Sequence, residues 1–460
     1  MKRLFLNILI VAVAGLSLYS CRMGREFRTP ELDIPATFDE GGMTEGIASD
    51  IGWSTLYADT VLQGLITQAL EHNKDMLVAA ARIRELMAAK RITFANMMPG
   101  VGFNLYGERE YLNYGGNKKS YDPELQANFA FNWELDIWGN LRWQNEAAVA
   151  QYMQSIEAQR ALQLTIVSQI AQMYFDLKAL DRELSIVRQT LDARRDAVHF
   201  ATLRYEGGLT SEIPYRQSLV ELARTETLVP KLENEIKLKE NDLSVLLGEF
   251  PTSIPRGGGD LSNIDLGVDL PVDLPSTLLE RRPDVLQAEQ ALREANANVG
   301  VALTDMFPKL RLTAKLGAEN AELTDFLKSP AWFISGAITG PLFQLGRKRA
   351  AHKAAQAAYE QAVYTYEKKI LDVFKEVNSA LNTYRKSREM RRSADALYRS
   401  ALSYNNLAKL QYVNGVVSYM DVLDAQRQLF DSEIAVNDAI LAELTATVSL
   451  YRALGGGLKQ

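Results

Sequence analysis

The sequence carries two copies of one residue pattern, and this duplication limits the folds that the chain can adopt. The segment LRYEGGLTS from Leu203 resembles LQYVNGVVS from Leu410. A duplicated chain folds as two equivalent units, so we expect the same elements in the same order in each copy. The pairs 207 positions apart are Tyr205 and Tyr412, Gly208 and Gly415, Ser211 and Ser418, Gly139 and Gly346, and Gly248 and Gly455; Asp75 and Asp284, Arg84 and Arg293, and Pro99 and Pro308 lie 209 apart.

Each copy predicts a helix, two strands, a very long helix, a turn and a last helix. In the first copy, helices are expected at about Leu56–Asn96 and Arg142–Arg204, and the last helix ends near Gly248. The predicted segments are a first repeat at 56–248 with strands at about 100–138, a Pro- and Gly-rich linker at 249–275, a second repeat at 276–456 with strands at about 308–345, and a tail at 457–460.

The long helix has one narrow apolar stripe, because apolar residues recur every three or four positions along it. At 1.5 Å per residue it would reach roughly 90 to 100 Å. A helix of this length needs support from neighbouring helices, as in coiled coils. The stripe comprises Leu162, Ile166, Ile170, Met173, Leu177, Leu180, Leu184, Val187 and Leu191; its counterpart comprises Ala355, Ala358, Ala362, Tyr366, Ile370, Val373, Val377 and Leu381.

The strand segments alternate apolar and polar residues, which is the period of a half-exposed strand. The clearest is ELQANFAFNWELDIW, which alternates from Leu125 to Ile137, followed by KLRLTAKLGAE from Lys309. Two weaker partners are GVGFNLYGE, with Val101, Phe103 and Leu105 on one face, and WFISGAITGPL, with Trp332, Ile334, Ile338 and Leu342.

Strands of this kind suit a membrane barrel with lipid on one face and a polar lumen on the other. Trp133, Trp138 and Trp332 would suit its interfaces. A soluble two-sheet sandwich would use the same alternation. Each chain supplies four predicted strands, lipid tolerates no open sheet edge, and a barrel needs at least about eight strands. Several subunits would therefore share one barrel.

The first residues predict export and a lipid anchor. A basic MKR precedes an apolar core, and LYSC ends the segment at Cys21, the one cysteine in the sequence. This pattern is typical of a lipoprotein signal peptide at 1–20 with acylation of Cys21, and 21–55 would be a lipid-anchored extended arm. The alternatives are an ordinary signal peptide with an incidental cysteine, or a short anchor helix.

Composition gives no sign of an enzyme, a metal site or a nucleic-acid partner. The formal net charge is −6 without basic blocks. The three histidines, His72, His199 and His352, lie on separate helical segments without a second ligand nearby. No phosphate-binding loop, nucleophile elbow or zinc-protease motif occurs. We expect no catalytic residue and no cofactor other than the covalent lipid on Cys21.

Several motifs together resemble the TolC-like outer-membrane factor family, in its lipoprotein branch of multidrug and metal efflux channels that work with inner-membrane pumps of the RND type. The resemblance covers essentially residues 21–457. Its motifs are GWSTL from Gly52, ALEHN from Ala69, LERRPDVLQAEQALREANANVGVA from Leu279, FPKLRL from Phe307, GPLFQLGRKRA from Gly340, YVNGVVSYMDVLDAQRQLF from Tyr412 and LYRALGGG from Leu450.

The resemblance implies a mainly α-helical protein with a membrane β-barrel. Three chains would close a twelve-stranded barrel in the bacterial outer membrane, above a periplasmic α-helical barrel. The trimer would be the exit duct of a tripartite efflux system, joined to an inner-membrane pump by a periplasmic adaptor protein. The alternative within this resemblance is the outer-membrane duct of a type I protein secretion system. Outside it, an adaptor protein or a fibrous trimeric adhesin would share the helices but not the strands between them or the duplication.

The two turns are the first candidate site. Gly207, Gly208 and Gly415 permit positive φ where a long helix reverses, and a structural turn needs nothing more. By resemblance, the turns are the periplasmic tip that contacts the adaptor. The residues assigned to this contact are Tyr205, Gly207, Gly208, Ser211, Gly415 and Ser418.

Asp421 and Asp424 are the second candidate site, three residues apart on one face of the last helix. Carboxylates in a first helical turn stabilise the N-terminal end, so helix capping is one interpretation. The resemblance implies another, in which both aspartates and Tyr412 form the pore gate, each aspartate giving a ring of three in a trimer. Val417 departs from the pattern, because some relatives carry an arginine there that pairs with these carboxylates.

Overall fold

The structure, a computed structural model, divides into two compact units that are described separately. Unit 1 takes Met1–Leu32, Ala81–Ile156 and Gln287–Lys368; unit 2 takes Asp33–Ala80, Glu157–Leu286 and Lys369–Gln460. The described residues are 22–35, 38, 51–113, 119–259, 261, 264, 275–322, 324–341 and 343–456. Cys21 and the predicted signal peptide lie outside these ranges.

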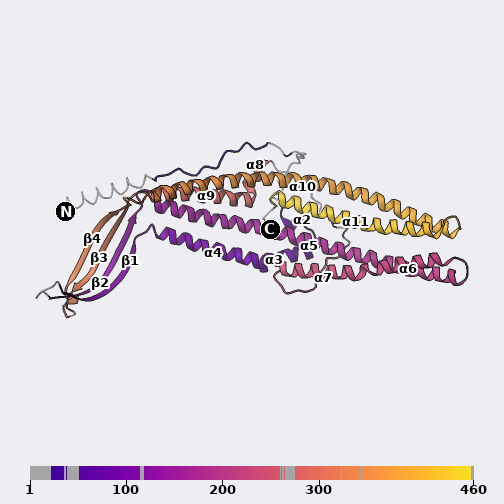
Figure 1. Cartoon of the computed structure of the whole chain (residues 1–460), viewed down its shortest axis with the longest axis horizontal. Helices are drawn as coiled ribbons and strands as arrows, with labels where there is room; N and C mark the ends of the chain where they lie inside the picture. Colours follow the sequence, from indigo (N-terminus) through magenta and orange to yellow (C-terminus); the bar gives the residue numbers. More distant parts are fainter. Residues whose placement is uncertain are drawn as a thin grey trace. The chain divides into compact units, whose positions relative to one another are not determined.

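The expected order of helix, strands, long helix, turn and helix occurs twice in the described residues (Figure 1). The two long helices, α5 and α10, each contain 67 residues. The elements are α2 (Trp53–Leu56), α3 (Thr60–His72), α4 (Lys74–Ala95), β1 (Gly100–Asn113), β2 (Lys119–Leu135), α5 (Asn140–Glu206), α6 (Glu212–Glu226), α7 (Leu228–Leu246), α8 (Pro275–Arg281), α9 (Pro283–Thr304), β3 (Lys309–Asn320), the 3-10 turn η4 (Phe326–Lys328), β4 (Pro330–Thr339), α10 (Arg347–Val413) and α11 (Tyr419–Ala453).

Six of the nine described glycines with a positive φ mark equivalent places in the two repeats. They form three pairs, each 207 positions apart: Gly139 and Gly346 at 84° and 80°, Gly208 and Gly415 at 69° and 75°, and Gly248 and Gly455 at 81° and 84°. Matching backbone angles at matching positions support the internal duplication inferred from the sequence.

The four strands described in unit 1 form one antiparallel sheet in the order β1-β2-β3-β4. The register sets Phe129 of β2 opposite Phe103 of β1 and Leu316 of β3, and Leu316 opposite Trp332 of β4. Successive residues of a strand alternate between faces, so these four side chains share one face.

This face is apolar across all four strands, and its side chains are largely exposed: Phe129 is 61% exposed and Ile334 73%. The opposite face is mostly polar. Members of the apolar face are Val101, Phe103, Leu105, Ala127, Phe129, Phe131, Trp133, Leu310, Leu312, Ala314, Leu316, Trp332, Ile334 and Ile338; the opposite face carries Asn104, Gln126, Asn128, Asn132, Glu134, Arg311, Thr313, Lys315, Glu319 and Ser335.

The alternation predicted through Ile137 is wrong at its end, because β2 stops at Leu135. Asp136 leaves the strand and accepts hydrogen bonds from the backbone N–H groups of Leu141 and Arg142, both at 3.0 Å. The carboxylate thereby satisfies donors at the start of α5 that have no partner within the helix. Leu342, predicted on the apolar face of the last strand, lies outside the described residues.

The single helix predicted from Leu56 to Asn96 is wrong, because α2, α3 and α4 replace it. Asn73 separates α3 from α4: its Oδ1 accepts from the N–H groups of Asp75 and Met76, at 2.9 and 3.1 Å. Its amide also donates to the carbonyl of Leu246 at 2.8 Å. An asparagine that caps a new helix and ties it to α7 makes the break favourable.

The last helix of the first repeat is also divided, into α6 and α7, at Thr227. Pro230 lies in the first turn of α7 and has no N–H to continue the hydrogen bonding of α6. In the second repeat the corresponding α11 is continuous.

The core of unit 2 confirms the apolar stripe of the long helix. Ile170, Leu177 and Val187 of α5 are fully buried, and in α10 Val377 is fully buried and Val373 is 1% exposed. Within the described residues, α11 has the length and composition of a membrane span, but 56% of that window is buried. It is a core helix of unit 2.

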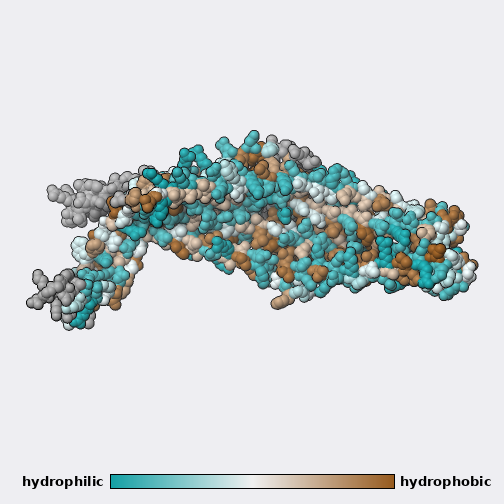
Figure 2. Space-filling model, in the orientation of Figure 1, coloured by the Kyte–Doolittle hydropathy of each residue, from teal (hydrophilic) through white to brown (hydrophobic). Residues whose placement is uncertain are grey.

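Apolar side chains also remain exposed on the helices, as brown patches among hydrophilic residues (Figure 2). Those of α10 in unit 2 include Leu371, Met390, Leu397, Leu407 and Leu410, which are 51–69% exposed. Exposed apolar side chains along a helix are typical of surfaces that meet another protein.

A buried ionic cluster fixes the start of α9 in unit 2, within the RRPD motif. Arg282 is 6% exposed and donates to both oxygens of Asp284 at 2.9 Å and to Glu376 at 2.7 Å. Lys369 also pairs with Asp284 at 2.7 Å. Burial by itself would raise the pKa of Asp284, but the bonds from Arg282 and Lys369 lower it to about 2.

We expect Asp284→Asn to lower the free energy of unfolding at pH 7 by about 2 kcal/mol, because buried Arg282 loses its main counter-charge. The pKa is lower in the folded state, so the contribution of Asp284 is present above its ordinary pKa of 3.8 and is lost as the pH falls towards 2. Denaturant unfolding of the detergent-solubilised protein between pH 7 and pH 2.5 measures both effects.

The control is Asp325→Asn, because Asp325 forms an exposed pair with Lys328. This variant should retain the parent stability. Equal stability of Asp284→Asn and the parent at pH 7 would contradict the expected role.

Candidate functional site

The predicted tip residues lie in two reversing turns of unit 2, between α5 and α6 and between α10 and α11 (Figure 1). Both turns close in the same way. The N–H of Leu209 donates to the carbonyl of Arg204 at 2.8 Å, and that of Val416 to the carbonyl of Gln411 at 2.9 Å. Each bond reaches back five residues across a glycine with positive φ, as in a Schellman motif.

The expected glycine conformation is confirmed at Gly208 and Gly415, but Gly207 has no positive φ. At Gly207 a Cβ atom would lie 3.1 Å from the carbonyl oxygen of Leu203. Because Gly207 has no side chain, it avoids a clash with the carbonyl at the end of α5. The positive φ of Gly208 allows the chain to reverse its direction.

Tyr205 and Tyr412 each pack on a ring just beyond their turn. Tyr205 stacks on Tyr215, with ring centroids 5.8 Å apart and planes within 2°, and Tyr412 packs on Tyr419 at 5.7 Å. The guanidinium of Arg204 lies 5.3 Å from the centre of the Tyr412 ring. This cation–π contact brings the end of α5 to the end of α10, so the two turns lie together.

The serines that begin the two returning helices differ in what they bind. Ser211 is the N-cap of α6 without a side-chain capping bond. Ser418 is the N-cap of α11, and both its N–H and its Oγ donate to Oδ2 of Asp421, at 2.8 and 2.7 Å. These bonds from Ser418 lower the pKa of exposed Asp421.

Asp421 therefore forms a capping box within one chain, which agrees with the capping interpretation for this residue. Asp424, one turn further, accepts a hydrogen bond from the hydroxyl of Tyr404 on α10 at 3.3 Å. Neither contact tests the rings of the gate hypothesis, because they require several copies of the chain.

A buried ionic cluster beside the turns was not anticipated. Glu221 of α6, 3% exposed, accepts from Arg194 of α5 through Oε2 at 2.5 Å and from Arg427 of α11 through Oε1 at 2.5 and 3.0 Å. We call these three residues the Glu221 clamp. In the sequence, Glu221 and Arg427 are 206 positions apart. The buried residues of α6 are Ser218, Glu221 and Thr225, so the sequence around Glu221 offered no apolar pattern that would have indicated its burial.

The comparisons with known proteins agree on one family. A family model described as outer membrane efflux protein matches residues 65–249 and 274–456. The cation efflux system protein CusC of Escherichia coli strain K12 is 31% identical over 96% of this chain and 98% of CusC. The probable outer membrane lipoprotein SilC of Salmonella typhimurium is 30% identical over 94% of each protein.

The chain belongs to the outer membrane efflux protein family. Its fold agrees: the open state of the Neisseria gonorrhoeae MtrE outer membrane channel is similar with a TM-score of 0.88 and 27% identity, over 95% of this chain and 99% of MtrE. The family resemblance inferred from the sequence is confirmed. This outer membrane efflux protein is a channel of the bacterial outer membrane that serves efflux.

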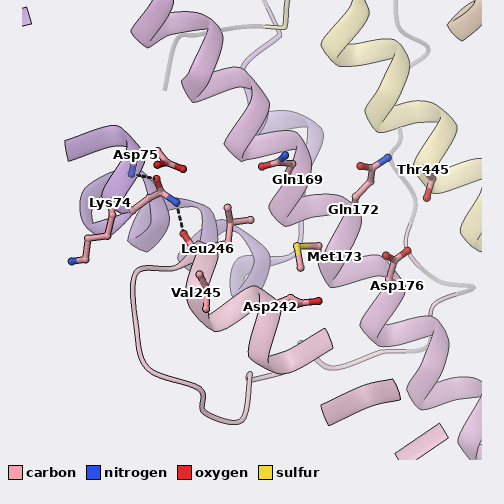
Figure 3. A pocket seen from close by; sticks show the side chains of 11 residues that line it. Lys74, Asp75, Gln169, Gln172, Met173, Asp176, Asp242, Val245, Leu246 and Thr445 are labelled. Carbon is pink, nitrogen blue, oxygen red and sulfur yellow. Dashed lines mark hydrogen bonds between the residues drawn. The ribbon is translucent and has the colours of Figure 1, made fainter. Parts of the chain in front are cut away.

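A pocket of about 650 Å³ lies in unit 2 of this efflux protein, between α4, α5, α7 and α11 (Figure 3). Asn73 at its edge bonds to Asp75 and Leu246, and Asp176 pairs with Lys239 at 3.0 Å. Nowhere in the described ranges do three or more His, Cys, Asp or Glu side chains form a group that could hold a metal ion.

The first described residues of the N-terminal arm belong to unit 1 of the efflux protein and pack on α5. The guanidinium of Arg22 lies 3.2 Å from the centre of the Trp143 ring, and the indole N–H donates to the carbonyl of Met23 at 2.7 Å. Arg22 also forms an ion pair with Glu146. The arm is therefore fixed from the residue that follows Cys21.

Proposed function

We propose that three copies of this outer membrane efflux protein close one twelve-stranded β-barrel on a periplasmic α-helical barrel. The apolar face of the sheet supports this proposal most directly. It crosses all four strands, and among the described residues β1 and β4 are edges without a partner strand. Lipid leaves no water for such edges, so other copies must supply the missing pairs. The apolar side chains exposed on α10 would pack on neighbouring copies.

The first test uses an arginine on either face of the sheet. Phe129→Arg should abolish or strongly reduce trimers in the outer membrane, because arginine facing lipid at mid-depth costs about 2–4 kcal/mol per copy. Asn132→Arg, on the polar face three residues away, should insert normally. Trimer yield in outer-membrane fractions, by heat-modifiable gel migration, measures both. Equal yields would contradict the assignment of the lipid face.

The trimer would pass small molecules or ions from an inner-membrane pump of the RND type through a periplasmic adaptor protein. We assign the adaptor contact to the two turns, at Tyr205, Gly207, Gly208, Ser211, Gly415 and Ser418. Small residues at an exposed tip allow the helical hairpin of a partner to approach the backbone closely. Leu209 and Val416, 73% and 69% exposed, would supply apolar contact area in the same place.

The pore would close at Tyr412, Asp421 and Asp424. In a trimer the two aspartates give six carboxylates around the axis, and such rings favour cations. The corresponding positions of the first repeat are Pro214 and Gln217, so these rings come from the second repeat alone. The adaptor would open the pore by separating the hairpins.

The double variant Asp421→Asn with Asp424→Asn tests the gate separately from the cap, because asparagine still accepts hydrogen bonds but has no charge. We expect higher resting conductance and lower cation selectivity of trimers in planar bilayers, with trimer yield unchanged. If the double variant has the same conductance and the same cation selectivity as the parent protein, the two aspartates are helix-capping groups without a role in the pore.

We also propose that Cys21 carries the covalent lipid that anchors the arm. Cys21→Ala behind a signal peptide of the non-lipoprotein type should lose labelling by a radioactive or clickable fatty acid, because the thiol is the acyl acceptor. Trimers should still be detected, since the barrel holds the membrane by itself. A variant that still incorporated the label would contradict this site.

A further inference from the structure

Unit 1 contains two junctions between a strand and a long helix, one in each repeat. The first leads from the end of β2 at Leu135 to α5, and the second from the end of β4 at Thr339 to α10. The duplication makes their residues equivalent at an offset of 207, so each junction serves as a comparison for the other. The equivalent residues are Asp136 and Phe343, Trp138 and Leu345, and Arg142 and Arg349.

The first junction finds its partners within the chain. Asp136 caps α5 and also pairs with Arg142, at 3.2 Å. The ring of Trp138 packs on Phe307 with centroids 5.0 Å apart, and its indole N–H donates to the carbonyl of Pro308 at 2.8 Å. Its charges and its large aromatic side chain are therefore satisfied by neighbouring elements of unit 1.

The second junction exposes the equivalent side chains. Phe343 stands where the first repeat has the capping carboxylate and is 83% exposed, and Leu345 is 88% exposed. Arg347 and Arg349 are exposed in the first turn of α10, and no acidic residue occurs in that turn. Cations in a first helical turn oppose the helix dipole, so helix stability does not account for them. We call these four residues the junction patch.

The backbone at Leu345 has an unfavourable conformation. Among the described residues that are not glycine, Leu345 alone has a positive φ, at 47°. This conformation costs free energy in a residue with a Cβ atom, and such strain is concentrated at functional positions. The side chain that it orients is almost fully exposed, so packing within the described chain does not offset the cost.

Contacts at the end of the sheet indicate where the junction patch lies relative to a membrane. Gly340 follows β4 directly, and a Cβ atom there would lie 2.9 Å from Cα of Pro308. Pro308 accepts from Trp138, and the carbonyl of Trp138 accepts from the N–H of Met23 at 3.1 Å, two residues after Cys21. Tryptophan at the end of an apolar strand face is typical of a membrane–water interface. In the proposed barrel, the patch therefore lies at the membrane surface, where the proposed lipid anchor also begins.

The chemistry of the junction patch fits a phospholipid. Its apolar side chains suit acyl chains, and guanidinium groups bind phosphate through paired hydrogen bonds. A second copy of the chain is a poorer partner, because four carboxylates of unit 1 at or next to the junctions already pair with cations of their own chain. These pairs are Glu134 with Arg311, Asp136 with Arg142, Glu146 with Arg22, and Asp305 with Lys348.

We propose that the junction patch binds anionic phospholipid in the periplasmic leaflet of the outer membrane. Phe343 and Leu345 lie among the acyl chains, and Arg347 and Arg349 bind the phosphate of the headgroup. The bound lipid holds the start of α10 at the membrane surface, as the contacts of Trp138 hold the start of α5. This inference rests on the proposed barrel, because it requires that β4 ends at the lipid interface.

Tryptophan quenching by brominated phospholipids tests the patch in purified full-length trimers reconstituted into bilayers. Phe343→Trp introduces a reporter at an exposed position, so trimer yield should equal that of the parent. Bromine quenches only rings close to the acyl chains. In brominated phosphatidylcholine, Phe343→Trp trimers should therefore be quenched more strongly than parent trimers.

The same reporter measures recognition of the headgroup. Brominated phosphatidylglycerol, added to unlabelled phosphatidylcholine, should associate with the reporter roughly five- to twenty-fivefold more strongly than brominated phosphatidylcholine, because each cation near an anionic lipid contributes about a factor of five. Adding Arg347→Ser with Arg349→Ser should reduce this preference to about one. The matched control adds Arg392→Ser with Arg399→Ser, which removes two exposed cations from the later part of α10 and should retain the preference.

Two results would overturn the proposal. Equal quenching of Phe343→Trp and parent trimers would show that the patch faces another copy or the lumen. Extra quenching that is the same for both lipids, or that is unaffected by Arg347→Ser with Arg349→Ser, would show apolar contact without recognition of the headgroup.

The parent trimers separate this inference from the proposed barrel. Trp332 lies on the apolar face of β4 and is 75% exposed in the single chain, so brominated lipid should quench the parent protein. If the parent is quenched and the Phe343→Trp reporter adds nothing, the barrel holds and the lipid site is wrong. If the parent is not quenched, the assignment of the lipid face is itself wrong.

Discussion

Within the described residues, the two edges of the four-stranded sheet have no partner strand, and the rest of the structure depends on this constraint. β1 and β4 end the sheet, and one of its faces is apolar from edge to edge. In a membrane, each backbone N–H or C=O without a partner costs several kcal/mol, so a single chain cannot span the bilayer by this sheet alone. In the proposed trimer, each tip residue would occur three times around the symmetry axis. The proposed rings of carboxylates follow from the same edge pairing.

In both repeats the long helix reverses in a similar turn, but the helix that follows the turn is continuous only in the second repeat. The paired glycines hold nearly equal φ values, so both long helices reverse in the same way. The returning helix is divided at Thr227 in the first repeat, whereas α11 runs without a break for 35 residues. Both candidate gate carboxylates, Asp421 and Asp424, lie on this continuous helix of the second repeat.

Patterns of neighbouring residues in the sequence predicted those features of the fold that depend on neighbouring residues. Alternation predicted the strands, because one face of the sheet is apolar throughout, and glycines predicted the turns, because positive φ excludes most other residues. The break at Asn73 was missed, since its driving force includes a bond to Leu246, distant in the sequence. The Glu221 clamp was missed for the same reason. A glutamate on an amphipathic helix is normally solvated, and no residue near Glu221 in the sequence indicates that two distant arginines pair with it.

Capping and gating by Asp421 are compatible, because the two roles use different atoms. Both bonds from Ser418 end on Oδ2, so Oδ1 is free of these contacts, and the side chain is exposed. The cap also restricts the rotamers of a carboxylate that would otherwise sample several orientations, which would reduce the entropy lost if three copies met at an axis as proposed. Within one chain, the bonds from Ser418 lower the pKa of Asp421 and so favour its charged form. A residue that first orders the turn can therefore also contribute a fixed negative charge to the pore.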